Sequence, residues 1–401
     1  MSIRTRNDKP DVDFASAPWP YYAEDELEAS TSVLRSGKVN YWTGNEGREF
    51  EKEFAAATGQ KYGVALANGT VAIELALRVL GIEAGEEVIV TPRTFIASAS
   101  AAVVQGIKPV FADVDQDSGN VTAETIARVI TPATRAIIAV HLAGWPCDMD
   151  PIMDLAAKHN LSVIEDCAQC HGAYYKGRPC GSFGDMAAWS FCQDKIMTTG
   201  GEGGMLTTSD TRLWEAAWSY KDHGKSYDVV YNRQHAPGFR WLHTHFGTNW
   251  RMTEMQSAIG RAQLKKLPDW HSARLRNAEI LIDRLSSLRG LRVPVPGRDI
   301  EHAYYKFYAY VVPEELKDDW TRDRIMTECS SCGIPCFSGS CSEIYLEEAF
   351  KEAGLQPAHR LPVARELGET SLMFLVHPTL TEEHMHRVAD IVEEVLREAS
   401  D

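Results

Sequence analysis

The chain lacks several features that would assign it to a class of protein at once. No stretch of its 401 residues approaches the roughly 18 consecutive apolar residues that a membrane-spanning helix needs. The N-terminal segment MSIRTRNDKPDVDF has no apolar core, so we expect no secretory signal peptide. Basic residues form no long run, and the formal net charge of -15 disfavours binding to nucleic acid or anionic membrane. We therefore expect a cytoplasmic protein that binds neither nucleic acid nor membrane.

Cysteine is present, but the sequence does not indicate a framework of disulfide bonds. Nine cysteines in a chain with no export signal are typical of reduced thiols. Two pairs, Cys167/Cys170 and Cys329/Cys332, have the CxxC spacing of zinc sites. Because the first pair ends an apolar run, we favour buried thiols and expect no metal, with a zinc site as the alternative. The cysteine spacing does not explain the role of the cysteine-rich segment 329–341.

Short apolar runs alternate with helical stretches from residue 48 to about residue 205. A first helix is expected over residues 23–36, where Gly37 ends it. The later apolar runs are predicted strands, namely YGVALA, EEVIV, KPVFADV, RAIIAVHL, LSVIED, MAAWSF and GGMLTT. Apolar strands between amphipathic helices indicate a mostly parallel sheet that helices cover on both faces.

The pattern changes towards the C-terminus. Residues 252–290 are helix-rich, and a predicted strand, helix, strand and final helix then follow over residues 304–313, 322–334, 371–378 and 381–400. We predict three segments: an N-terminal helix and loop over 1–47, a large α/β domain over 48–269 and a smaller α+β domain over 270–401.

Three features that could bind a ligand or take part in a reaction each follow a predicted strand. Gly69 and Thr70 open a helix after YGVALA, where free N–H groups attract phosphate. Asp166 ends LSVIED, and Lys195 lies in the glycine-rich loop after MAAWSF. The first can also be a helix start without a ligand, and the second a structural cap. A lysine in a tight loop at the end of a buried strand is unusual, because burying an ammonium is costly. Because open parallel sheets bind ligands at the carboxyl ends of their strands, the three are expected to meet.

Together these features match the needs of pyridoxal 5'-phosphate (PLP), which requires a phosphate anchor, an acid for its ring nitrogen and a lysine. A dinucleotide site fits less well, because a strand follows the glycines of GGEGG where a nucleotide fingerprint needs a helix.

Motifs along nearly the whole chain resemble the DegT/StrS-type sugar aminotransferases, which are fold-type-I PLP enzymes. They include ANGTVAIELAL, TPRTFIASASAAV, EDCAQCHGA, SFGDMAAWSFCQDK and GTNWRMTEMQSAIGRAQL. The resemblance implies an α/β fold with a mostly parallel mixed sheet in a large domain and a smaller α+β C-terminal domain. It also implies transfer of an amino group, from glutamate, to a nucleotide-linked keto-sugar of the 4-keto-6-deoxy type, by a ping-pong mechanism.

The resemblance also implies roles for individual residues. Lys195 would be the Schiff-base lysine and proton shuttle, and Asp166 would pair with the ring nitrogen. Gln169 would lie near the ring hydroxyl and Phe95 against the ring. The phosphate would be held by Gly69, Thr70 and Ser190.

A second subunit and the substrate complete the predicted site. Asn249 would reach the phosphate in the neighbouring subunit, which implies a homodimer with shared active sites. Trp42, in an aromatic loop, and His171 are candidate substrate residues, although a buried structural histidine is an equal alternative.

Some alternatives for the function stay open. Family members with histidine at the lysine position perform dehydration, and Lys195 argues against that branch. An aminotransferase for a carbocyclic ketone such as an inosose, and a non-catalytic regulatory protein with this fold, remain possible.

Overall fold

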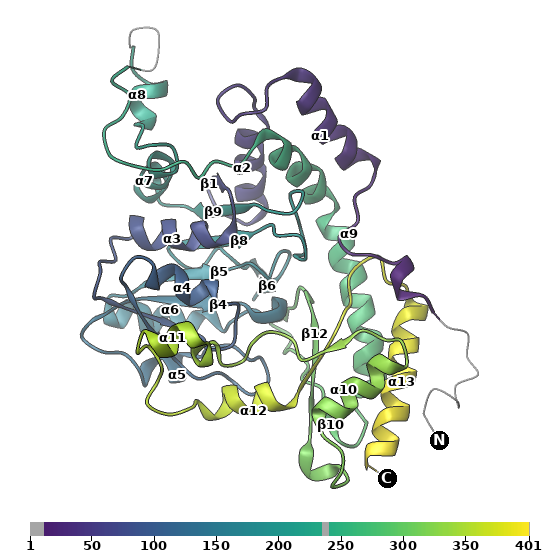
Figure 1. The fold of residues 1–401 in the computed structure, drawn as a ribbon. Helices are drawn as coiled ribbons and strands as arrows, with labels where there is room; N and C mark the ends of the chain where they lie inside the picture. Colours follow the sequence, from purple (N-terminus) through teal and green to yellow (C-terminus); the bar gives the residue numbers. More distant parts are fainter. Residues whose placement is uncertain (1–11, 235–239, 401) are drawn as a thin grey trace.

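The computed structural model describes residues 12–234 and 240–400. Figure 1 shows a large sheet-centred part beside a smaller part near the C-terminus, with helix α9 (Glu254–Leu285) running along both. The final helix α13 (Glu382–Ser400) packs beside α9. The other α-helices are α1 (Glu24–Ser36), α2 (Glu46–Ala57), α3 (Gly69–Val79), α4 (Ala97–Val103), α5 (Ala123–Ala127), α6 (Met149–His159), α7 (Thr211–Lys221), α8 (Tyr227–Tyr231), α10 (Arg322–Ser331), α11 (Glu348–Glu352) and α12 (Pro362–Thr370).

A seven-stranded sheet forms the centre of the large part, in the order β1-β9-β8-β5-β4-β2-β3. Its strands are β1 (Tyr62–Leu66), β2 (Glu87–Val90), β3 (Lys108–Phe111), β4 (Thr134–Val140), β5 (Ser162–Asp166), β8 (Met186–Ser190) and β9 (Gly204–Thr208). Strand β9 pairs antiparallel with β1 and β8, whereas the other neighbouring strands pair in parallel. The predicted mixed, mostly parallel sheet is therefore confirmed.

The strands of this sheet are buried on both faces. In β4, Ile138 packs with α3 and α4, and Ile137 packs on the opposite face with α5 and α6. Successive side chains of a strand point to opposite faces, so two apolar faces require a continuous apolar run. This is why the covered strands were visible in the sequence as uninterrupted runs.

The smaller part contains a four-stranded antiparallel sheet in the order β10-β12-β14-β13. Its strands are β10 (Leu291–Arg292), β12 (Phe307–Val311), β13 (Cys336–Phe337) and β14 (Ser371–Phe374). Helices α10 and α13 and the second half of α9 share its apolar core. A third, small sheet of β11 (Ile300–Glu301), β6 (Tyr174–Tyr175) and β7 (Arg178–Pro179) has no counterpart in the predicted elements.

The division of the chain into three segments remains a proposal. The proposed boundary at residue 269 falls inside the continuous helix α9, which contacts α1 and α2 as well as α13. Part of the proposed C-terminal domain packs on the large sheet, since the rings of Tyr345 and Phe350 lie 5.5 and 5.6 Å from that of Phe111. Within the described residues, no helix is long and apolar enough to span a membrane.

Candidate functional site

The carboxyl ends of β5 and β8 and the first turn of α3 meet at a cavity of about 750 Å³. The C-terminal part of the chain closes it with Tyr305, Lys306 and Ser340. Seven residues that the sequence predicted for the cofactor line this one cavity: Gly69, Thr70, Phe95, Asp166, Gln169, Ser190 and Lys195.

Asp166 is a buried carboxylate at the end of β5, only 5% exposed. Its Oδ2 accepts a hydrogen bond of 2.6 Å from Ser98 Oγ, and its Oδ1 accepts one of 3.1 Å from the N–H of Ala168. No lysine, arginine or histidine of residues 12–234 and 240–400 forms an ion pair with it. A buried anion that lines a cavity without a cationic partner suits a ligand with a positive charge, such as a protonated ring nitrogen.

The start of α3 forms a close-fitting cradle against the end of β8. Asn68 caps the helix, and its Oδ1 accepts a hydrogen bond of 3.0 Å from the N–H of Val71. A Cβ on Gly69 would lie 2.7 Å from Cβ of Ser190, so only glycine fits there. The first N–H groups of a helix have no intrahelical partner, and they favour a bound anion. The cradle therefore fits the phosphate of PLP.

Lys195 lies in the loop after β8, and two hydrogen bonds to its backbone groups fix this loop. Its N–H donates to the carbonyl of Cys192 over 3.1 Å, and its own carbonyl accepts a 3.0 Å bond from Trp19 Nε1. Lys195 Nζ lies 5.0 Å from the centre of the Tyr305 ring. The backbone of Lys195 is thus fixed by hydrogen bonds, and its amine lies at the cavity wall.

Asp194, the neighbour of Lys195, accepts a hydrogen bond from the hydroxyl of Tyr305. Burial raises the pKa of Asp194, but the charge of Lys195 and the bond from Tyr305 outweigh it, so that the pKa is lowered overall. The carboxylate is therefore ionised beside two lysines, Lys195 and Lys306.

Phe95 and Gln169 complete the predicted cofactor set. The ring of Phe95 is 66% exposed and lines the cavity, which leaves an aromatic face open to a flat ligand. Gln169 is buried, and its Oε1 accepts a 2.7 Å hydrogen bond from the N–H of Ala143. That bond orients the amide, so its NH₂ group is the end free to meet a ligand oxygen.

Trp42, Asn249 and His171 lie outside this cavity. Trp42 Nε1 donates a 2.6 Å hydrogen bond to Asp222, and Lys225 lies 4.1 Å above its ring centre. Asn249 is exposed and pairs with Asp222 through an isolated backbone bridge. Neither Trp42 nor Asn249 lines the cavity of this chain.

His171 lines a second cavity of about 350 Å³, and Trp189 lines both this cavity and the first. Its ring is surrounded by those of Phe54, Trp189 and Phe191, and its two nitrogens have no hydrogen-bond partner among the described residues. Burial, with the charges of Lys195 and Arg274, lowers its pKa to about 3. His171 is therefore neutral, and it does not line the cavity that contains Lys195.

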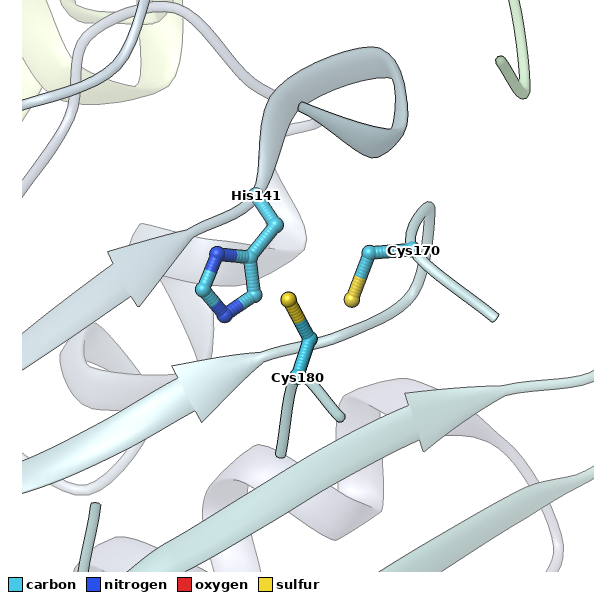
Figure 2. Close-up of side chains that lie close together, drawn as sticks. All are labelled: His141, Cys170 and Cys180. Atoms are coloured by element: carbon cyan, nitrogen blue, oxygen red, sulfur yellow. The ribbon is translucent and has the colours of Figure 1, made fainter. Parts of the chain in front are cut away.

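The two CxxC pairs of the zinc alternative lie in separate apolar clusters, Cys167 and Cys170 in one and Cys329 and Cys332 in another. A different set of possible metal ligands lies near the first pair. Figure 2 shows His141, Cys170 and Cys180 close together, with ligand atoms within 4.8 Å of one another. However, His141 Nδ1 accepts a 3.0 Å hydrogen bond from the N–H of Cys147, so its proton sits on Nε2, which donates to Glu165 over 3.0 Å. Because both ring nitrogens are engaged, His141 has no lone pair for a metal in this arrangement. The absence of a metal remains our prediction.

Sequence reasoning missed several residues of the cavity wall, namely Thr94, Ser98, Asp194, Tyr305, Lys306 and Ser340. For Lys306 a signal existed, because YYKFYAY places one charged residue within an aromatic strand. The sequence contains no such signal for Ser98, because a serine early in a predicted helix is common.

Known proteins of similar sequence were found along nearly the whole chain. A model of the DegT/DnrJ/EryC1/StrS aminotransferase family matches residues 20–393. A GDP-perosamine synthase of Caulobacter vibrioides is 37% identical over 364 residues, covering 88% of this chain and 92% of that protein. A UDP-N-acetyl-3-dehydro-α-D-glucosamine 3-aminotransferase of Acidithiobacillus ferrooxidans is 37% identical over 384 residues, covering 92% of this chain and 97% of that protein.

Two further similarities concern a different substrate class and the fold. A protein of Streptoalloteichus tenebrarius named for L-glutamine:3-amino-2,3-dideoxy-scyllo-inosose aminotransferase activity is 34% identical over 326 residues, 79% of this chain and 74% of that protein. The crystal structure of an aminotransferase from Psychrobacter cryohalolentis is 57% identical, with a TM-score of 0.94 over 96% of this chain and 99% of that one.

Proposed function

Since the chain belongs to the DegT/DnrJ/EryC1/StrS aminotransferase family, we propose that this PLP-dependent enzyme moves an amino group from glutamate to a nucleotide-linked keto-sugar, of the 4-keto-6-deoxy type. The observation that carries the proposal is the single cavity in which an acid, a lysine and a phosphate cradle meet. Relatives named for GDP-linked and UDP-linked sugars support a nucleotide-linked acceptor. We also propose a cytoplasmic location, which the free thiols of the chain support.

The residues of the cavity fit the cofactor one by one. Gly69, Thr70 and Ser190 would hold the phosphate, and Phe95 would lie against the ring. Asp166 would keep the proton on the ring nitrogen, with Ser98 orienting the carboxylate. When bound, PLP supplies the electron sink for breaking the C–H bond next to the transferred nitrogen.

Lys195 is the proposed covalent anchor and the base of the reaction. Its Nζ would take the proton from the Cα of the donor and return it elsewhere on the reacting group. The loop fixed by Cys192 and Trp19 holds the amine at the wall while it performs both transfers. After release of 2-oxoglutarate, the keto-sugar would pass through the same steps in reverse.

The proposed assembly is a homodimer with shared active sites. Asn249 is exposed and lies outside the cavity of its own chain, so its side chain is available to a second subunit. We propose that it completes the phosphate site of the neighbour.

A substrate comparison tests the proposed function. PLP-loaded protein is incubated with glutamate and, in turn, GDP-, dTDP- and UDP-linked 4-keto-6-deoxy sugars, a UDP-linked 3-keto sugar and an inosose, while 2-oxoglutarate is measured. We expect kcat/KM for one 4-keto-6-deoxy nucleotide sugar to exceed that for the inosose by at least about 100-fold. Preference for the inosose, which the similarity to the Streptoalloteichus protein makes the second candidate, would overturn the acceptor assignment. Loaded protein that transfers no amino group to any acceptor would favour a regulatory role.

A further inference from the structure

Lys306 presents a second amine to the cavity that contains Lys195. It precedes β12, and its Nζ lies 4.7 Å from the centre of the Tyr305 ring. Lys195 Nζ lies 5.0 Å from the same ring centre. Two amines thus lie close to one aromatic ring at the cavity wall, and only one of them is needed to anchor a cofactor.

The charge of Lys306 has no carboxylate partner of its own. Among residues 12–234 and 240–400 no carboxylate forms an ion pair with it, and nearby Asp194 is engaged by the hydroxyl of Tyr305. The pKa of Lys306 is lowered to about 8, chiefly by burial, with the charges of Arg274 and Lys195 adding to this effect and that of Asp194 opposing it. A poorly solvated ammonium near two other cations is costly unless an anion joins it.

The position of Lys306 identifies the kind of anion. The cradle for the cofactor phosphate lies at Gly69, Thr70 and Ser190, on elements other than the segment that carries Lys306. Lys195 must reach the reacting carbon, and Lys306 shares the same ring with it. An α-carboxylate is attached directly to that carbon, whereas the pyrophosphate of a nucleotide sugar is separated from its keto carbon by the sugar ring. Because both amines lie within 5.0 Å of one ring centre, their shared position favours the carboxylate.

We propose that Lys306 binds the α-carboxylate of the amino-acid donor and thereby places the donor's Cα beside Lys195. This assignment rests on the proposed function, because it presupposes an amino-acid donor in this cavity. Tyr305 lies next to both amines, and its hydroxyl holds Asp194, so that this nearby carboxylate does not occupy the anion site.

The test uses PLP-loaded Lys306→Met and Lys306→Arg, with Lys158→Met as the matched control on the exposed end of α6. Glutarate, a dicarboxylate without the reactive amine, is titrated by calorimetry, and KM is measured separately for glutamate and for the keto-sugar. We expect Lys306→Met to weaken glutarate binding and to raise the glutamate KM by about 10- to 100-fold, the scale of one hydrogen bond to a charged group. Lys306→Arg should restore part of the glutarate affinity and part of the glutamate KM. The keto-sugar KM should change less than about twofold in Lys306→Met.

The outcomes separate this inference from the proposed function. Unchanged glutarate affinity in Lys306→Met, or an equal rise in the keto-sugar KM, overturns the carboxylate site. A parent protein that transfers amino groups while Lys306→Met binds glutarate normally retains the proposed function and refutes this inference. A parent protein that transfers none, but binds glutarate through Lys306, retains the anion site and refutes the proposed function.

Discussion

Ser98 donates a hydrogen bond of 2.6 Å to the buried carboxylate of Asp166, across 68 residues of sequence. The Oγ of Ser98 also lies 2.8 Å from that of Thr94. The carboxylate is therefore held in one orientation at the cavity wall, although no cation of the described residues is paired with it.

Replacing Asp166 by Asn should separate catalysis from folding. Asparagine keeps the shape but removes the charge that holds a proton on the ring nitrogen. We expect Asp166→Asn to fold and to bind PLP, yet to transfer amino groups at least about 100-fold more slowly in a single turnover. If Asp166 is only a structural cap, the thermal midpoint falls instead while the material that folds turns over normally.

Replacing Ser98 by Ala should have a smaller effect of the same kind. Loss of one hydrogen bond to a charged group costs about 1.5 kcal/mol, so we expect the single-turnover rate to fall by about 10-fold with little change in the glutamate KM. Ser100, whose side chain lies on the same helix α4, offers a matched Ser→Ala control. Equal rates for the two variants would show that Ser98 does not act through Asp166.

Acid should destabilise the protein partly through His171. Its folded pKa of about 3 lies below the ordinary value of 6.5, so the unfolded chain binds the proton first as the pH falls. This contribution is complete above pH 6.5 and is lost as the pH falls towards 3; it amounts to about 2 kcal/mol between pH 7 and pH 5. His302 and His377 have similarly lowered pKa values and add to the loss.

The variant His171→Phe tests this directly, because the cage of Phe54, Trp189 and Phe191 suits a third phenyl ring. Urea unfolding at pH 7 and pH 5 should show a loss of stability smaller by about 2 kcal/mol than in the parent. The same loss in both proteins would exclude His171 as its source.

Shared active sites predict complementation between subunits. Asn249→Ala should retain PLP less well, because a neighbour would lose a donor to the phosphate. Mixing inactive Lys195→Ala with inactive Asn249→Asp should restore activity in heterodimers, which contain one intact site. Verified subunit exchange without recovered activity, or a fully active monomer by light scattering, argues against the shared arrangement.

Much of the fold could be predicted because covered parallel strands leave a strong pattern. The run from Ala136 to Val140 is apolar throughout because both of its faces are buried. Since the carboxyl ends of such strands meet at one edge, the convergence of Gly69, Asp166 and Lys195 followed from topology alone. Strands β6, β7 and β11 have two residues each, too few to show a periodic pattern.

The remainder of the site depends on contacts between distant segments. Ser98 gains its role from Asp166, and Tyr305 from Asp194, 111 residues earlier. Neither local periodicity nor composition records such pairs. The position of Lys306 likewise depends on how the C-terminal part closes over the large sheet.

The central claim is that Lys195, and not its neighbour Lys306, bonds the cofactor covalently. Borohydride reduction of the PLP-loaded protein fixes the cofactor to the lysine that bears it, and mass spectrometry of the peptides then locates the added mass. We predict that the label lies on the peptide containing Lys195, at one site per chain, and that Lys195→Ala carries none. A label on Lys306, or loaded protein with no covalent label, would contradict the account.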